Sequence, residues 1–210
     1  DPFIKQLSDF GKIVPYGNHG LDQVRQILTN ESIGAIIVEP ILGRGGKVVP
    51  ENDFLPSLRA SCDEYGALLI IDEIYTGLNR TGKLFACEHW EVIPDIICLG
   101  KALSGGFPIS ACTGKATIMD SWPESDGEAI HTSTFLGHPG GCAMALASLE
   151  KHSSPEISLE VTHKGNRFKE LLENIKAIPK GSVRGMGLML GLEIIDDQGK
   201  PNGALVSKII

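Results

Sequence analysis

The sequence lacks a long apolar run, an excess of basic residues and a complete nucleotide-binding glycine motif. A transmembrane helix needs about 20 consecutive apolar residues, and no run in this chain approaches that length. The formal net charge of −7 argues against a nucleic-acid surface, because phosphate binding requires a basic patch. Neither a Walker A motif nor a full dinucleotide fingerprint is present. The sequence therefore predicts a protein without membrane spans or nucleic-acid partners.

Signatures of disulfides and metal sites are also missing. The five cysteines are odd in number, show no C-x-x-C spacing and lie mostly in apolar surroundings, as is typical of reduced thiols. The six histidines show no spacing typical of metal ligands. The first three residues, Asp1 to Phe3, do not resemble the start of a signal peptide. We therefore expect a cytoplasmic protein that has no metal site.

Apolar segments with strand and helix periodicity alternate along most of the chain, which favours an α/β fold. The expected architecture is a mostly parallel sheet flanked by helices. Strands are predicted at 34–38, 67–71, 95–99, 108–113 and 188–195. Helices are predicted at 21–28, 53–65, 115–122 and 139–151 and from Pro155 onward. Asn52 or Asp53 is expected to cap the second helix, and Ser153 or Ser154 the last one.

The long helix after residue 153 is expected to leave the first domain. We therefore assign residues 1–152 to a large domain and residues 153–210 to the start of a smaller α/β domain at the carboxyl end. The chain begins without methionine and ends in an apolar segment, 204–210, that resembles a helix cut short. We expect it to be a piece of a longer protein, with part of the large domain upstream.

Two charged side chains follow buried strands of the predicted sheet. Asp72 comes directly after strand 67–71, and Lys101 closes the apolar run 95–99 before a glycine turn. The carboxyl ends of strands are where an α/β sheet builds its site. Pyridoxal phosphate needs this pair, because a lysine forms the Schiff base and an aspartate keeps the pyridine nitrogen protonated. The sequence therefore predicts Lys101 and Asp72 as the catalytic residues of a pyridoxal-phosphate enzyme.

Each residue also has a plainer interpretation. Asp72 is suited to cap the following turn, and Lys101 to extend its amine to solvent from a strand end. Lys101 must lose its proton to act as a nucleophile, and partial burial would favour the neutral amine. The pair together, followed by Gly105-Gly106, favours the functional interpretation over two separate structural roles.

The cofactor phosphate requires hydroxyls, backbone N–H groups or a helix amino terminus. Residues 131–135 (HTSTF) precede a predicted helix and offer three hydroxyls, which makes them the best candidate anion site. Taken alone, the segment is equally explained as a plain Ser/Thr turn, but together with the Lys101 and Asp72 pair we name Ser133 and Thr134 as cofactor-binding residues. The glycine-rich residues 43–46 and 184–187 are weaker candidates, since such runs are more often plain turns.

Three segments together resemble class III, fold-type-I aminotransferases, the relatives of 4-aminobutyrate, ornithine and acetylornithine aminotransferases. The three segments are residues 38–46 (VEPILGRGG), 69–82 (LIIDEIYTGLNRTG) and 94–106 (PDIICLGKALSGG). Residues 131–139 (HTSTFLGHP) and 184–191 (RGMGLMLG) extend the match. The resemblance covers nearly the whole chain past residue 30, and the order and spacing of the motifs agree.

The resemblance implies a role for each matching residue. Lys101 forms the Schiff base and moves the substrate proton, while Asp72 holds the pyridinium. Ile74 packs on one face of the cofactor ring. Thr134 reaches across the interface of a homodimer with a shared active site to the partner's cofactor phosphate. Glu39 matches an acid near the site, and a structural role is about as well supported.

The implied reaction transfers an amino group from an amino acid or amine to a 2-oxo acid. Two departures stand out. Tyr75 occupies the position of a glutamine that contacts the cofactor ring oxygen, and Arg44 replaces a glutamate that takes part in substrate selection. Arg44 is therefore a candidate for binding a substrate carboxylate. Two alternatives stay open: an aminomutase, racemase or decarboxylase of the same fold, and a non-catalytic scaffold domain.

Overall fold

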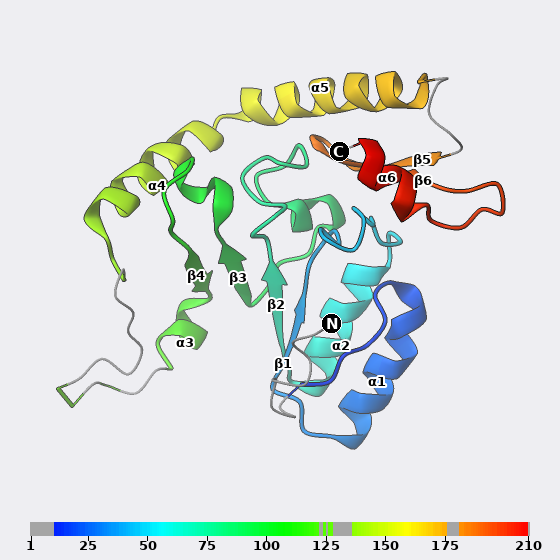
Figure 1. Ribbon diagram of the computed structural model, residues 1–210. Coiled ribbons are helices and arrows are strands. Elements are labelled where there is room, and N and C mark those ends of the chain that lie inside the picture. Colours follow the sequence, from blue (N-terminus) through cyan, green and yellow to red (C-terminus); the bar gives the residue numbers. More distant parts are fainter. Residues whose placement is uncertain (1–10, 122–123, 125, 128–135, 176–180, 210) are drawn as a thin grey trace.

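The computed structural model describes residues 11–121, 124, 126–127, 136–175 and 181–209 (Figure 1). Its centre is a four-stranded sheet in the order β1-β2-β3-β4. Strands β1 (Ala35–Val38), β2 (Leu68–Asp72) and β3 (Ile96–Leu99) are parallel, and β4 (Ala111–Gly114) pairs antiparallel with β3. The predicted α/β class with a mostly parallel sheet is confirmed.

One face of the sheet carries the core. The 3-10 helix η2 (Asn18–Gly20) leads into α1 (Leu21–Asn30), which packs with α2 (Phe54–Tyr65) beside the sheet (Figure 1). Leu69 and Ile71 of β2 are fully buried in the same cluster as apolar residues of both helices. Helix α2 ends at Gly66, whose φ of 71° is the left-handed conformation that glycine adopts at little cost.

The opposite face of the sheet is more exposed. Side chains alternate along a strand, so Ile70 and Asp72 point away from the face that buries Leu69 and Ile71. Ile37, in the edge strand β1, is 67% exposed. This second face carries Asp72 at the carboxyl end of β2, and it is therefore the face on which the candidate site begins.

The segments after β2 are short helical turns and then two long helices. They are the 3-10 helices η3 (Ala86–Trp90) and η4 (Lys101–Ser104), followed by α3 (Ala116–Met119), α4 (Pro139–His152) and α5 (Pro155–Glu173). Helix α4 packs on η4, and Ala145 joins Leu99 and Leu103 in a second apolar cluster. Lys101 is thus carried by a turn that α4 holds in place.

A separate two-stranded sheet, β5 (Gly181–Met186) and β6 (Met189–Ile194), lies under α5 and is followed by α6 (Gly203–Ile209) (Figure 1). Gly165 of α5 contacts the backbone of Gly187, which links the two strands. The hairpin also contacts the first part of the chain, since Leu188 N donates to Arg80 O at 3.0 Å.

The elements differ from the predictions mainly at their ends. Strand β4 begins at Ala111 rather than at 108, and α3 ends at Met119 rather than at 122. Asp53 directly precedes α2 but does not cap it, because its carboxylate instead accepts from Asn18 Nδ2 at 2.7 Å. Ser154 likewise leaves α5 uncapped and bonds to Glu156. Strand β5 was not predicted.

Candidate active site

Asp72 and Lys101 lie at the same edge of the sheet. Asp72 ends β2, and Lys101 follows the end of the neighbouring strand β3 by two residues. The two strands are parallel, with Asp72 opposite Cys98, so their carboxyl ends lie side by side. This edge is where doubly wound α/β folds bind ligands. The topology thus places the two residues that the sequence singles out at the same edge of the sheet.

The Asp72 carboxylate is half-buried and fixed on one side. Its Oδ1 accepts from Ile74 N at 3.0 Å, so the plainer role of capping the turn after the strand is present. Across the described part of the chain, no partner contacts the other carboxylate oxygen. Asp72 therefore combines a fixed orientation with one oxygen that is free to bind a ligand.

Lys101 has an unusual backbone. Its φ is 45°, in the left-handed region where a non-glycine residue costs about 1–3 kcal/mol. The strained residue starts the turn η4, which Gly105 closes with a φ of 67°. Such strain often marks functional sites. The expectation that Lys101 is partly buried is wrong for this structure, because its side chain is exposed.

The amine of Lys101 lies over an aromatic ring. Its Nζ is 3.6 Å from the ring centre of Tyr75, and Lys47 Nζ is 5.3 Å from the same centre. The ring also packs against Gly43, where an added Cβ would lie 3.2 Å from it. Ring faces attract ammonium groups, so Tyr75 holds the Lys101 amine at a defined place. Sequence reasoning did not find Lys47, which has no motif of its own.

Glu39 organises the loop after β1. Its Oε2 accepts from Gly43 N at 2.9 Å, and Tyr16 Oη donates to the carbonyls of Glu39 and Pro40. Burial, and then the charge of Glu39, raises the pKa of Tyr16 well above its ordinary value. Because Glu39 already holds the Gly43 amide, residues 43–46 do not present a free anion cradle. The structural role foreseen for Glu39 is present in this geometry.

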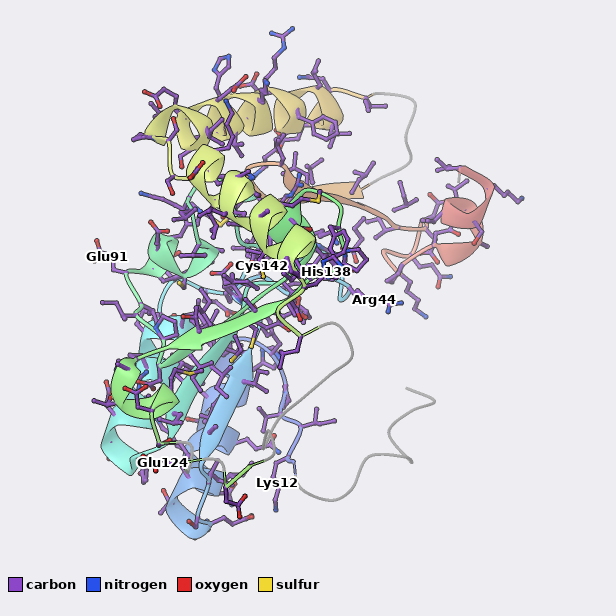
Figure 2. The ribbon with its side chains drawn as sticks, turned by 90° about the vertical axis from the view of Figure 1, so that its left-hand side faces the viewer. Lys12, Arg44, Glu91, Glu124, His138 and Cys142 are labelled. Carbon is purple, nitrogen blue, oxygen red and sulfur yellow. The ribbon has the colours of Figure 1, made fainter. Side chains whose placement is uncertain are left out.

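Two arginines near this loop differ in their surroundings. Arg184 is occupied, since its Nε donates to Gly46 O at 2.5 Å and its guanidinium pairs with Glu193 at 2.8 Å. The weak anion candidate at 184–187 is therefore engaged internally. Arg44 is exposed, and among the described residues no side chain pairs with it (Figure 2). Arg44 is thus a cation available to an outside ligand.

Glu73, directly after Asp72, is a buried acid that sequence reasoning passed over. It is only 1% exposed, and its carboxylate accepts from the Thr76 hydroxyl and from Cys87 N. Burial raises the pKa of Glu73, and these hydrogen bonds act in the opposite direction. Glu73 therefore fastens the loop after β2 to η3 and supports the turn that carries Ile74 and Tyr75.

The far edge of the sheet has its own anchor, Asp95, just before β3. Its carboxylate has three partners, which are Arg59 at 2.7 Å, Lys115 at 2.6 Å and the backbone amide of Leu69 at 2.8 Å. Burial alone would raise the pKa of Asp95, but these contacts outweigh it and lower the pKa to about 2. The cluster fixes β2, β3 and α2 together, at the edge opposite the candidate site.

A cleft of about 360 Å³ opens on the β1 side of Asp72. Glu39 and Leu42 line it beside Asp72, and Tyr16 and Phe54 line its apolar end. Lys101, Ile74 and Tyr75 do not line it. The Ile74 side chain instead packs beside Gly100, because a Cβ added at Gly100 would lie 3.5 Å from Ile74. Asp72 thus stands between this cleft and the turn that carries Lys101.

The predicted phosphate-binding residues Ser133 and Thr134 lie outside the described residues, as does the whole segment 131–135. The helix that follows, α4, begins at Pro139, and His138 Nδ1 accepts from Gly141 N at 3.2 Å.

Within the described ranges, no helix is long and apolar enough to cross a membrane. The same residues contain no group of three or more side chains arranged to hold a metal ion.

Known proteins are similar to this chain in both sequence and fold. The family model "Aminotransferase class-III" matches residues 16–209. The acetylornithine aminotransferase of Elizabethkingia anophelis is 39% identical with a TM-score of 0.78, over 87% of this chain and 45% of that one. The ornithine aminotransferase of Plasmodium yoelii is 35% identical with a TM-score of 0.76, over 89% and 48%.

An aminotransferase of Bacillus anthracis matches 100% of this chain and 48% of its own, with 29% identity and a TM-score of 0.82. The chain therefore spans about half the length of these solved relatives. The match extends over nearly all of the chain, including both Asp72 and Lys101. On this ground the chain belongs to the class-III aminotransferase family.

Proposed function

We propose that this chain is part of a pyridoxal-phosphate-dependent aminotransferase. The observation that carries the proposal is the placement of Asp72 and Lys101 at the carboxyl edge of two neighbouring parallel strands, within a member of this family. Since the chain spans about half of its relatives, the activity belongs to the whole protein. The family match does not favour an aminomutase, racemase, decarboxylase or scaffold.

The residues present suit pyridoxal phosphate. One oxygen of Asp72 is free of partners within the described chain, and no described carboxylate pairs with the Lys101 amine. The turn after Lys101 is open, because nothing lies within 4 Å of a Cβ added at Gly105 or Gly106. We assign the ring contacts to Ile74 and Tyr75. Ser133 and Thr134 remain the proposed phosphate ligands.

When bound, pyridoxal phosphate withdraws electrons from the α-carbon of the amino substrate and so weakens its C–H bond. Lys101 would hold the cofactor through its amine, and the same amine, when free, would carry the proton at that carbon. Asp72 would hold the proton on the pyridine nitrogen, since a nearby carboxylate favours the cationic form of the ring. Tyr75 keeps the Lys101 amine close to the sheet edge.

The substrates would be an amino acid or amine as donor and a 2-oxo acid as acceptor. Arg44, exposed and without a described partner, is assigned to a substrate carboxylate, and Glu39 to the neighbouring loop. We further propose a homodimer in which Thr134 reaches the partner's cofactor. The cysteine pattern of the sequence, odd in number and without C-x-x-C spacing, supports a reducing compartment, the cytoplasm.

Residues 1–152 are assigned to the cofactor-binding large domain and residues 153–210 to the start of the small domain. The separate sheet of β5 and β6 supports this division. Contacts between the hairpin and the loop after β1 mean that the two parts touch at the candidate site.

The first test is covalent capture of the cofactor. The purified chain and the full-length protein are incubated with pyridoxal phosphate, reduced with borohydride and mapped by mass spectrometry. We expect the phosphopyridoxyl group on Lys101, and loss of that label in Lys101→Ala, with Lys115→Ala as the matched control. Labelling of the full-length protein elsewhere, with Lys101 unmodified, would contradict the assignment.

The second test is amino transfer itself, measured on the full-length protein. Ornithine and N-acetylornithine serve as donors and 2-oxoglutarate as acceptor, and glutamate is measured as product. Release of carbon dioxide or racemised donor without glutamate would point to the other reactions of this fold. Capture of the cofactor without turnover of any donor would favour the scaffold.

A further inference from the structure

Two of the five cysteines face each other across neighbouring strands. Cys98 of β3 lies directly opposite Cys112 of β4 in the antiparallel register. Side chains of directly opposed residues point to the same face of the sheet. Cys98 is also opposite Asp72 of β2, so Asp72, Cys98 and Cys112 form one row across three strands.

The hydrogen bonds identify the kind of pair. At the end of this ladder Lys115 N donates to Asp95 O at 3.1 Å, while the Asp95 amide donates to Leu69 O. Asp95 and Lys115 thus make one of the two bonds of a hydrogen-bonded pair. Pair types alternate along an antiparallel ladder, so the third pair from it, Cys98 with Cys112, is a non-hydrogen-bonded one. Consistent with this, the Cys98 carbonyl points the other way and accepts from Glu73 N of the β2 side.

A non-hydrogen-bonded pair brings the two side chains closest. Its Cα atoms are separated by about 4.5 Å, which is within the range of about 4.4–6.8 Å that a disulfide spans. The strand spacing at this pair is therefore compatible with a bond between Cys98 and Cys112. The register itself supplies the geometry of a dithiol site.

The two thiols differ in access. Cys112 is exposed and Cys98 is half-buried. Burial raises the pKa of Cys98, and the negative charges of Cys112 and Asp72 and a hydrogen bond with Cys112 raise it further. Cys112 is therefore the thiol that a reagent from solution reaches first. Cys98 is then placed to attack the mixed disulfide formed on Cys112.

We propose that Cys98 and Cys112 are a redox-active dithiol that a low-molecular-weight disulfide such as oxidised glutathione converts into an internal disulfide. The Cys112 sulfur attacks one sulfur of the oxidant, whose S–S bond breaks and releases one glutathione thiol. The Cys98 sulfur, after losing its proton to water, then attacks Cys112 and releases the second glutathione thiol. The protein loses two hydrogen atoms, and the oxidant is reduced to two thiols.

The other cysteines provide internal comparisons. Cys62 and Cys87 are buried, and burial raises the pKa of Cys62 to about 11 and that of Cys87 to about 12. Cys142 is exposed at the start of α4, next to His138, and is not paired in register with a second cysteine (Figure 2). Cys142 therefore has the access of Cys112 without a resolving partner.

The test exposes the full-length protein to oxidised glutathione, blocks free thiols with iodoacetamide and digests with trypsin. Cleavage after Lys101 separates peptide 84–101 from peptide 102–115, and a disulfide rejoins them. We expect most of Cys98 and Cys112 to be found in this linked product, assigned by fragmentation. Cys142 should instead retain glutathione. Far-UV circular dichroism of the same sample confirms that the chain is folded.

Variants then separate the two steps. In Cys98→Ser the glutathione should stay on Cys112, while Cys112→Ser should leave Cys98 unmodified. Cys142→Ser should form the internal disulfide as the parent chain does. A folded parent chain that retains glutathione on Cys112 with Cys98 still alkylated would overturn the proposal. So would a link from Cys112 to Cys87 in place of Cys98.

Discussion

The Nζ atom of Lys101 lies 3.6 Å from the ring centre of Tyr75. An exposed cation–π contact contributes about 0.5–1 kcal/mol. A double-mutant cycle of Tyr75→Ala and Lys101→Met should therefore give a coupling energy of about that size in urea unfolding. Tyr75→Phe keeps the ring face and should preserve the coupling. A coupling energy of zero would show that the contact with Tyr75 does not hold the Lys101 amine in place.

Stability should fall in acid because of Asp95. Its folded-state pKa of about 2 is below the ordinary value, so the ionised carboxylate stabilises the fold at neutral pH. This contribution, of the order of 2 kcal/mol, is present above about pH 4 and is lost as the pH falls towards 2.

Urea unfolding at pH 7 and pH 3 measures the effect. In Asp95→Asn the difference between the two pH values should shrink. Asp63→Asn is the matched control, because Asp63 also pairs with Arg59 but is largely exposed. An unchanged pH dependence in Asp95→Asn would refute the assignment of this stability to Asp95.

Asp72 has two separable roles. Asp72→Asn keeps an oxygen that accepts from Ile74 N, so the fold should keep its stability. The variant loses the charge proposed to hold the pyridinium proton, which is worth about 1.5–3 kcal/mol and lowers amino transfer by roughly ten- to a hundredfold. Steady-state rates of the full-length protein measure this. Asp72→Ala should lose both the hydrogen bond to Ile74 N and the negative charge. If Asp72→Asn were as active as the parent protein, the charge of Asp72 would have no role in amino transfer.

The packing of α5 on the hairpin depends on Gly165. A methyl group there would overlap with the carbonyl of Gly187, so Gly165→Ala should destabilise the chain by about 1–3 kcal/mol. Gly203→Ala is the control, since nothing lies within 4 Å of a Cβ added at that position. Thermal unfolding compares the two variants. If Gly165→Ala were as stable as Gly203→Ala, α5 would be able to shift away from the hairpin without loss of stability.

The sequence predicted those features that are local in the chain. Asp72 and Lys101 were found because buried strands and glycine turns leave a clear apolar pattern. Strand β5 was missed because residues 181–186 (GSVRGM) lack alternation and become a strand only by pairing with β6. The contacts of Tyr75 with Lys47 join segments that no spacing rule connects. The pairing of Cys98 with Cys112 likewise depends on register.

The loop after β1 is held from the carboxyl-terminal side of the chain. Arg184 of β5 grips Gly46, Lys47 Nζ donates to Gly43 O at 2.9 Å, and Gly43 supports the Tyr75 ring. Each step is a direct contact. A rigid-body rotation of the β5–β6 hairpin would therefore displace the loop after β1. The Tyr75 ring, and with it the Lys101 amine, would move together with that loop.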